Sequence, residues 1–198
     1  GGGGGGGGGG VGGWVGEEAA TGGVYAGSRH GAVASWEVVG RGLEGALEKA
    51  VEIGREIARR GYVLVTGATT GIPYWSAKGA KEEGGIVIGL SPASSKVQHV
   101  KSYRLPLDYP DLLIYTGVEY SGWTVLLIRS SDAVINICGR VGTLNEFTIA
   151  FEDKKPSGVL EGTGGTADML QGLLKDLKRG MGKTVFSEDP VELLDKVV

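Results

Sequence analysis

The chain has 198 residues, and its 41% hydrophobic and 22% charged residues are typical of a globular protein rather than a disordered or fibrous one. With 20 Lys and Arg against 23 Asp and Glu, the formal charge is −3, and because no dense basic stripe is present we expect no nucleic-acid partner. No apolar run approaches the roughly 18 to 20 residues that span a bilayer, so we expect no membrane association. A single cysteine and two histidines exclude an internal disulfide and predict no metal site. We therefore expect a cytoplasmic protein without a cofactor.

The N-terminal segment is dominated by glycine, and residues 1–10 contain nothing else. Glycine loses more backbone entropy on ordering than any other residue and has no side chain to bury. We expect residues 1–22 to be a disordered leader or tag and residues 23–198 to form one nucleotide-binding domain.

Six short runs of apolar, mostly branched residues occur from residue 23 onward, and most of them end in glycine or serine. Continuous apolar runs of this length, bounded by turn residues, are typical of strands that are buried on both faces. The predicted strands cover residues 23–28, 62–67, 86–91, 111–117, 132–139 and 157–162.

Amphipathic segments separate these runs. The clearest covers residues 43–60, where apolar side chains recur at helical spacing and Gly61 is placed to end the helix in a left-handed conformation. The other predicted helices cover residues 76–83, 123–130, 143–151, 167–179 and 191–198. Strands that alternate with helices predict an α/β fold: a Rossmann-like, doubly wound parallel sheet with helices on both faces.

Small and hydroxyl-bearing residues gather where four predicted strands end, at residues 27–29, 67–71, 139–143 and 161–166. In an open parallel sheet these ends share one edge, where ligands bind. Loops that enter helix N-termini offer unpaired N–H groups and a positive dipole end, which favour a phosphate. The candidate phosphate- or nucleotide-binding residues are Gly27, Ser28, Gly67, Thr69, Thr70, Gly71, Gly139, Arg140, Val141, Gly142 and Thr143.

Thr143 and Glu146 also have a structural explanation. A threonine followed three residues later by a glutamate forms a capping box, in which both side chains satisfy backbone N–H groups at a helix start. Serine and threonine at the other strand ends are equally common as simple turn residues. Both interpretations of these residues stay open on the sequence alone.

The stretch CGRVGTLNE, together with VYAGS and LVTGATTGIPYW, resembles the LONELY GUY or lysine decarboxylase-like superfamily. The family motif is Pro-Gly-Gly-x-Gly-Thr-x-x-Glu, and four positions match: Gly139, Gly142, Thr143 and Glu146. Cys138 stands in place of the proline and Arg140 in place of the second glycine. The superfamily includes cytokinin riboside 5′-monophosphate phosphoribohydrolases, which cleave the N-glycosidic bond of nucleoside 5′-monophosphates, and molybdenum cofactor carrier proteins.

The resemblance implies that Glu146 is the catalytic residue if the protein is a hydrolase. The hydrolases pair this glutamate with an arginine, and the corresponding position here is Trp123. Arg129 lies about 240° further around the same helix, at ~100° per residue, so Arg140 is the better substitute for holding a phosphate. Trp75 and Trp123 could stack on a base or pack in the core. The resemblance also implies a homodimer or higher homo-oligomer, formed through the helix that bears Trp123 and its neighbour.

Three functions follow from these observations. The protein is a nucleotide hydrolase, or a non-catalytic carrier of a phosphorylated heterocycle such as molybdenum cofactor, or an oligomeric protein whose glycine-rich edge is only structural. We favour phosphate-anchored nucleotide binding, with a small molecule as the partner.

Overall fold

The computed structural model describes residues 32–35 and 44–198, which form one α/β unit. The elements in chain order are β1 (Ala32–Ser35), α1 (Glu44–Arg59), β2 (Val63–Thr66), α2 (Ile72–Glu82), β3 (Val87–Ser91), a π-helix η1 (Gln98–Ser102), β4 (Leu112–Tyr115), α3 (Glu119–Arg129), β5 (Ala133–Ile137), α4 (Val141–Glu152), β6 (Ser157–Leu160), α5 (Ala167–Asp176), β7 (Thr184–Ser187) and α6 (Pro190–Val197).

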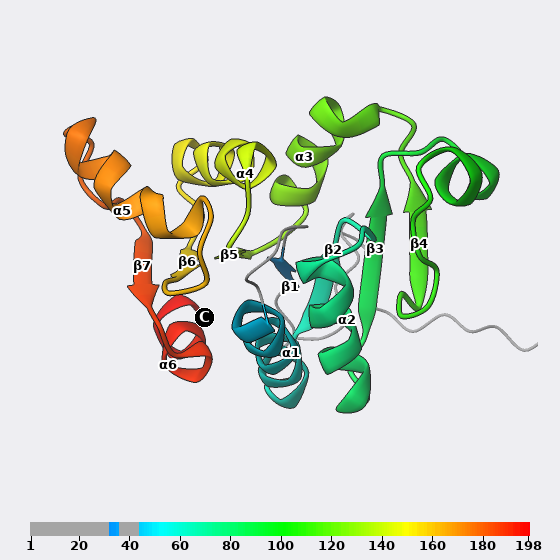
Figure 1. Cartoon of the computed structure of the whole chain (residues 1–198), viewed down its shortest axis with the longest axis horizontal. Helices are drawn as coiled ribbons and strands as arrows, with labels where there is room; N and C mark the ends of the chain where they lie inside the picture. The colour runs from blue at the N-terminus through cyan, green and yellow to red at the C-terminus, as the bar shows by residue number, and fades with distance from the viewer. Residues whose placement is uncertain (1–31, 36–43) are drawn as a thin grey trace, which may run out of the picture.

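The strands form one seven-stranded sheet in the order β4-β3-β2-β1-β5-β6-β7, and every pairing is parallel. Helices α1, α2 and α6 cover one face of the sheet, and α3, α4 and α5 cover the other (Figure 1). The predicted Rossmann-like, doubly wound architecture is therefore confirmed. None of the described helices is long and apolar enough to cross a membrane.

The core consists of two apolar layers, one on each side of the sheet. On the α1 side, Ile53 and Ile57 pack with Leu64 of β2. On the α3 side, Trp123 and Leu127 pack with Val65 and Leu90 of β2 and β3, while Phe147 of α4 and Leu170 of α5 pack with Val159 of β6. Both faces of the sheet are buried, which explains the continuous apolar runs in the sequence.

The predicted strands over residues 62–67, 86–91, 111–117, 132–139 and 157–162 correspond to β2 to β6. The predicted strand 23–28 and the predicted leader over residues 1–22 lie outside the described residues. The sequence did not indicate β1, β7 or η1, because β1 is a run of four small residues, AVAS, and β7 is short and only partly buried. Gly61 has a φ of 76° and ends α1 as predicted.

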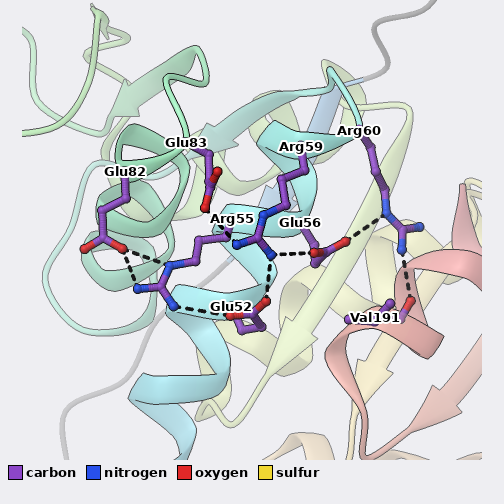
Figure 2. Close-up of polar contacts among 8 residues, drawn as sticks. All are labelled: Glu52, Arg55, Glu56, Arg59, Arg60, Glu82, Glu83 and Val191. Atoms are coloured by element: carbon purple, nitrogen blue, oxygen red, sulfur yellow. Dashed lines mark hydrogen bonds and ion pairs between the residues drawn. The ribbon is translucent and has the colours of Figure 1, made fainter.

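A row of ion pairs joins α1 to α2 (Figure 2). The guanidinium of Arg55 contacts Glu82 with an Nη2 to Oε2 distance of 2.6 Å, and that of Arg59 contacts Glu83 at 2.8 Å. Each of these side chains is about one-third exposed or more, so solvent screening keeps the contribution of each pair to stability small.

Glu56 is the most buried carboxylate in this row, with a side chain that is 14% exposed. It accepts hydrogen bonds from Arg59 at 2.8 Å and from Arg60 at 3.4 Å, and Arg60 in turn donates to the Val191 carbonyl of α6 at 3.3 Å (Figure 2). The hydrogen bond from Arg59, reinforced by Arg60, lowers the pKa of Glu56 below its ordinary value of 4.5. Glu56 thus holds the two arginines that reach the other helices, Arg59 toward Glu83 and Arg60 toward Val191.

We predict that Glu56→Gln lowers the free energy of unfolding by about 0.5 to 1 kcal/mol at neutral pH. Because the folded-state pKa is lowered, this stabilisation is fully present above the unfolded-state value of about 4.5 and is lost as the pH falls through the lowered folded-state value. Urea denaturation of the variant and the wild type, from neutral pH downward, should give curves that converge in acid. Glu48→Gln, an exposed position of α1 outside these ion pairs, is the control. Equal losses for the two variants at neutral pH would contradict this account.

Candidate functional site

The chain reverses its direction of travel across the sheet at β1. From β1 it adds β2, β3 and β4 on one side, and it then returns to place β5 on the other side of β1. In doubly wound sheets the ligand crevice lies beyond the carboxyl ends of the strands at this reversal. The two loops that follow the neighbours of β1 are the β2–α2 loop and the β5–α4 turn. Because β1 separates β2 from β5, these loops start about 10 Å apart.

The β5–α4 turn, residues 138–140, reverses the backbone in two left-handed residues. Cys138 has a φ of 53° and Gly139 a φ of 89°. A Cβ atom at Gly139 would lie 2.0 Å from Thr143 Oγ1, so only glycine fits this close approach. α4 then begins at Val141 with Arg140 as its N-cap residue, and no described side chain caps the helix. Residues 140–142 are exposed, so the amides of this first turn face a region that solvent reaches.

Thr143 lies inside the first turn of α4 and is fully buried, with 0% exposure. Its Oγ1 has no hydrogen-bond partner among the residues that the structure describes. The capping-box explanation of Thr143 is therefore wrong, because α4 starts two residues before Thr143 and the N-cap position belongs to Arg140. A buried hydroxyl without a partner costs about 1 to 3 kcal/mol.

Glu146 follows Thr143 by three residues, so the two side chains lie on one face of α4. Its side chain is 1% exposed. Carboxylates are almost never fully buried unless a partner compensates the loss of solvent.

The β2–α2 loop places a second set of predicted residues at the same edge. Gly67 and Thr69 are buried, Thr70 is exposed, and Gly71 is the N-cap of α2 with a φ of 78°. Pro73 occupies the start of α2 and has no N–H group, so this helix offers fewer donors than α4. Gly27 and Ser28, predicted from the first glycine-rich run, lie outside the described residues.

The helix starts differ in charge. The two without an acidic residue follow the β2–α2 loop and the β5–α4 turn. In the first turns, α3 has Glu119, α5 has Asp168 and α6 has Glu192. The first turns of α2 and α4 contain no acidic residue. An acidic side chain at a helix start neutralises the positive end of the dipole. Among α2 to α6, only the two helices that follow the strands beside β1 have no acidic residue in the first turn.

Trp123, at the position where the hydrolases have an arginine, is a core residue. Its side chain is 0% exposed, and its Nε1 donates a hydrogen bond to the Leu90 carbonyl at 2.6 Å. Arg129 points elsewhere and pairs with Asp153 at 2.9 Å, as its place on the helix predicted. Trp75 packs partly against the α1 side of the core, with Lys78 Nζ 4.9 Å from its ring centroid. Arg140 is the arginine of the β5–α4 turn.

The site residues predicted from the sequence include the turn after β5 but none from the β6–α5 loop, residues 161–166. Thr163 of this loop is 4% exposed and accepts a hydrogen bond from the Cys138 amide at 2.8 Å. Burial raises the pKa of the Cys138 thiol, so this side chain is a neutral apolar neighbour of the turn. The described residues contain no cluster of three or more His, Cys, Asp or Glu side chains able to hold a metal ion.

Several proteins of known structure are similar to this chain. The molybdenum cofactor binding protein of Rippkaea orientalis is 26% identical, with a TM-score of 0.72, over 86% of this chain and 99% of that one. The Moco carrier protein of Chlamydomonas reinhardtii is 27% identical, with a TM-score of 0.65, over 85% and 99%. DNA processing protein A of Helicobacter pylori, described as binding single-stranded DNA, is 19% identical with a TM-score of 0.57 over 83% and 78%, a likeness that shows the fold alone.

Sequence comparison also finds proteins that are similar to this chain. An uncharacterized protein of Archaeoglobus fulgidus is 34% identical over 119 residues, which cover 57% of this chain and 73% of that protein. The model of the SLOG cluster4 family matches residues 36–194. These findings confirm the resemblance to the LONELY GUY or lysine decarboxylase-like superfamily. The chain belongs to the SLOG cluster4 family.

Proposed function

We propose that this protein binds a nucleotide or a related phosphorylated heterocycle and that the phosphate occupies the first turn of α4. The observation that carries the proposal is the buried Thr143 hydroxyl, which lacks a hydrogen-bond partner among the described residues. A phosphate at this turn would accept from the hydroxyl and from the backbone amides of the helix start. Such a ligand would supply the partner that the Thr143 hydroxyl lacks among the described residues.

The charges around the turn favour the same ligand. The first turn of α4 has no acidic side chain, and the exposed Arg140 at its N-cap is free to swing toward an anion. Gly67, Thr69, Thr70 and Gly71 of the β2–α2 loop would approach the ligand from the far side of β1. In this proposal, Gly27 and Ser28 complete the binding loops, as the sequence indicates. Gly139, Val141 and Gly142 contribute backbone alone.

Two functions use such a site. In the first, Glu146 is a catalytic residue that stabilises positive charge on the ribose while the N-glycosidic bond of a nucleoside 5′-monophosphate breaks. In the second, the protein is a non-catalytic carrier. The relative from C. reinhardtii is named a Moco carrier protein, and the one from R. orientalis a molybdenum cofactor binding protein. Trp123 favours the carrier, because its buried indole replaces the arginine that the hydrolases use. A homodimer through α3 and a small-molecule rather than nucleic-acid partner remain part of the proposal.

We predict opposite effects of Thr143→Val on stability and on binding. Removing a buried hydroxyl that has no partner among the described residues should raise the free energy of unfolding by about 1 kcal/mol. The same change should weaken AMP binding about tenfold, because the phosphate loses a donor. Urea denaturation and isothermal titration calorimetry with AMP measure the two effects. Thr143→Ser, which retains the hydroxyl, should retain the affinity. A destabilised Thr143→Val protein with unchanged affinity would contradict the proposal.

We predict that Arg140→Ala weakens AMP binding about tenfold at low salt and less as the salt concentration rises, because an exposed guanidinium is screened. Arg129→Ala, which removes an exposed arginine of α3 that pairs with Asp153, is the matched control and should leave the affinity unchanged. If both variants bind AMP like the wild type at low salt, Arg140 has no part in binding the phosphate.

The wild type and the Glu146→Gln variant together distinguish the two functions, hydrolase and carrier. AMP and CMP are incubated with the wild type and the variant, and the free base is measured by chromatography. In a hydrolase the variant should still bind AMP while base release falls by about 100-fold or more. In a carrier, the wild type itself binds the nucleotide and releases no base. Base release that survives the substitution would exclude a catalytic role for Glu146.

A further inference from the structure

The carbonyl groups of the β5–α4 turn are all engaged by the segment that follows β6. The Cys138 carbonyl accepts from the Ala167 amide at 2.8 Å, and the Gly139 carbonyl accepts from the Thr166 amide at 2.9 Å. The Arg140 carbonyl accepts from the Thr166 hydroxyl at 2.8 Å. Three consecutive acceptors of the turn are therefore held by two residues at the start of α5.

This arrangement bears directly on anion binding. A phosphate is repelled by carbonyl oxygens and attracted by N–H groups, so a turn binds an anion only when its carbonyls are directed to other donors. Here the β6–α5 loop supplies these donors, and the exposed start of α4 at residues 140–142 keeps its amides for a ligand.

Thr163 connects the two loops at their base. Its hydroxyl accepts from the Cys138 amide at 2.8 Å and donates to the Leu160 carbonyl at 2.7 Å, so both functions of the hydroxyl are used. Gly165, with a φ of 64°, lies so close that a Cβ atom would be 2.3 Å from the Gly139 carbonyl oxygen. The two turns are packed backbone against backbone.

The β6–α5 loop does not offer a second anion site of this kind. Asp168 accepts a hydrogen bond from the Gly164 amide at 3.0 Å, so a carboxylate of the chain already occupies the start of α5. The glycines of this loop and those of the β5–α4 turn thus have different tasks, although the sequence patterns are alike.

We propose that the β6–α5 loop is the positioning element of the phosphate site, and that Thr163 is a positioning residue that holds the Cys138–Gly139 turn with its carbonyls directed away from the ligand. This inference rests on the proposed function for the ligand itself. It assigns the site's geometry to residues that lie outside the family motif.

The test compares Thr163→Val with Thr163→Ser in the full chain. Loss of the hydroxyl leaves the buried Cys138 amide without its acceptor, and we expect AMP affinity to fall about tenfold. Hydrogen exchange of the ligand-free protein should show the Cys138, Thr166 and Ala167 amides, whose hydrogen bonds join the two loops, exchanging about tenfold faster. Thr163→Ser retains the hydroxyl and should restore both values. Thr124→Val is the control, because it removes a buried hydroxyl that bonds the Tyr120 carbonyl in α3, away from the turn.

A second variant tests the inference even if Thr163→Val does not fold. Thr166→Val removes only the bond to the Arg140 carbonyl, at a half-buried position, and should weaken AMP binding severalfold without loss of the folded state. Wild-type affinity and wild-type exchange of the Cys138, Thr166 and Ala167 amides in Thr163→Val would overturn the inference, as would equal effects of Thr163→Val and Thr124→Val. A wild-type protein that does not bind AMP would refute the proposed function instead, and the exchange data would then decide by themselves whether Thr163 holds the turn.

Discussion

Parallel pairing of all seven strands is the constraint on which the site depends. It brings every loop after a strand to one edge, and the reversal of the chain at β1 separates the β2–α2 loop from the β5–α4 turn at that edge. The helix starts differ in charge. α3, α5 and α6 have an acidic residue in the first turn, and α2 and α4 do not. Strand topology places the helix dipoles, and side-chain choice decides which of them remain available to a ligand.

Stability and binding oppose each other at the β5–α4 turn. Two residues adopt left-handed conformations, one of them Cys138, which pays a steric cost that glycine avoids. The Thr143 hydroxyl is buried without a partner among the described residues. The rest of the fold offsets these costs through the apolar layers and the ion pairs of α1 shown in Figure 2. Strain and uncompensated polarity concentrated in one turn are typical of a binding site.

Much of this architecture could be predicted from the sequence, for identifiable reasons. Buried strands such as β3 and β5 are continuous apolar runs, and α1 has one apolar face and ends at Gly61. β1 could not be predicted, because AVAS contains only one branched residue, and its place in the centre of the sheet comes from tertiary pairing with Val63 and Ala133 and their neighbours. The role of Thr143 depended on where α4 starts, and a shift of two residues changed it from a cap to a buried side chain. Helix boundaries are the least certain part of a sequence pattern.

Contacts between residues that are far apart in the sequence could not be predicted either. The indole of Trp123 is fixed by the Leu90 carbonyl, 33 positions away, and the Cys138 amide by Thr163, 25 positions away. Neither contact has a signature in the residues around it.

A crystal structure of the protein with AMP tests the central claim most directly. The account predicts that the phosphate lies at the first turn of α4 with an oxygen within hydrogen-bond distance of Thr143 Oγ1. A phosphate bound elsewhere, with the Thr143 hydroxyl out of its reach, would contradict the account.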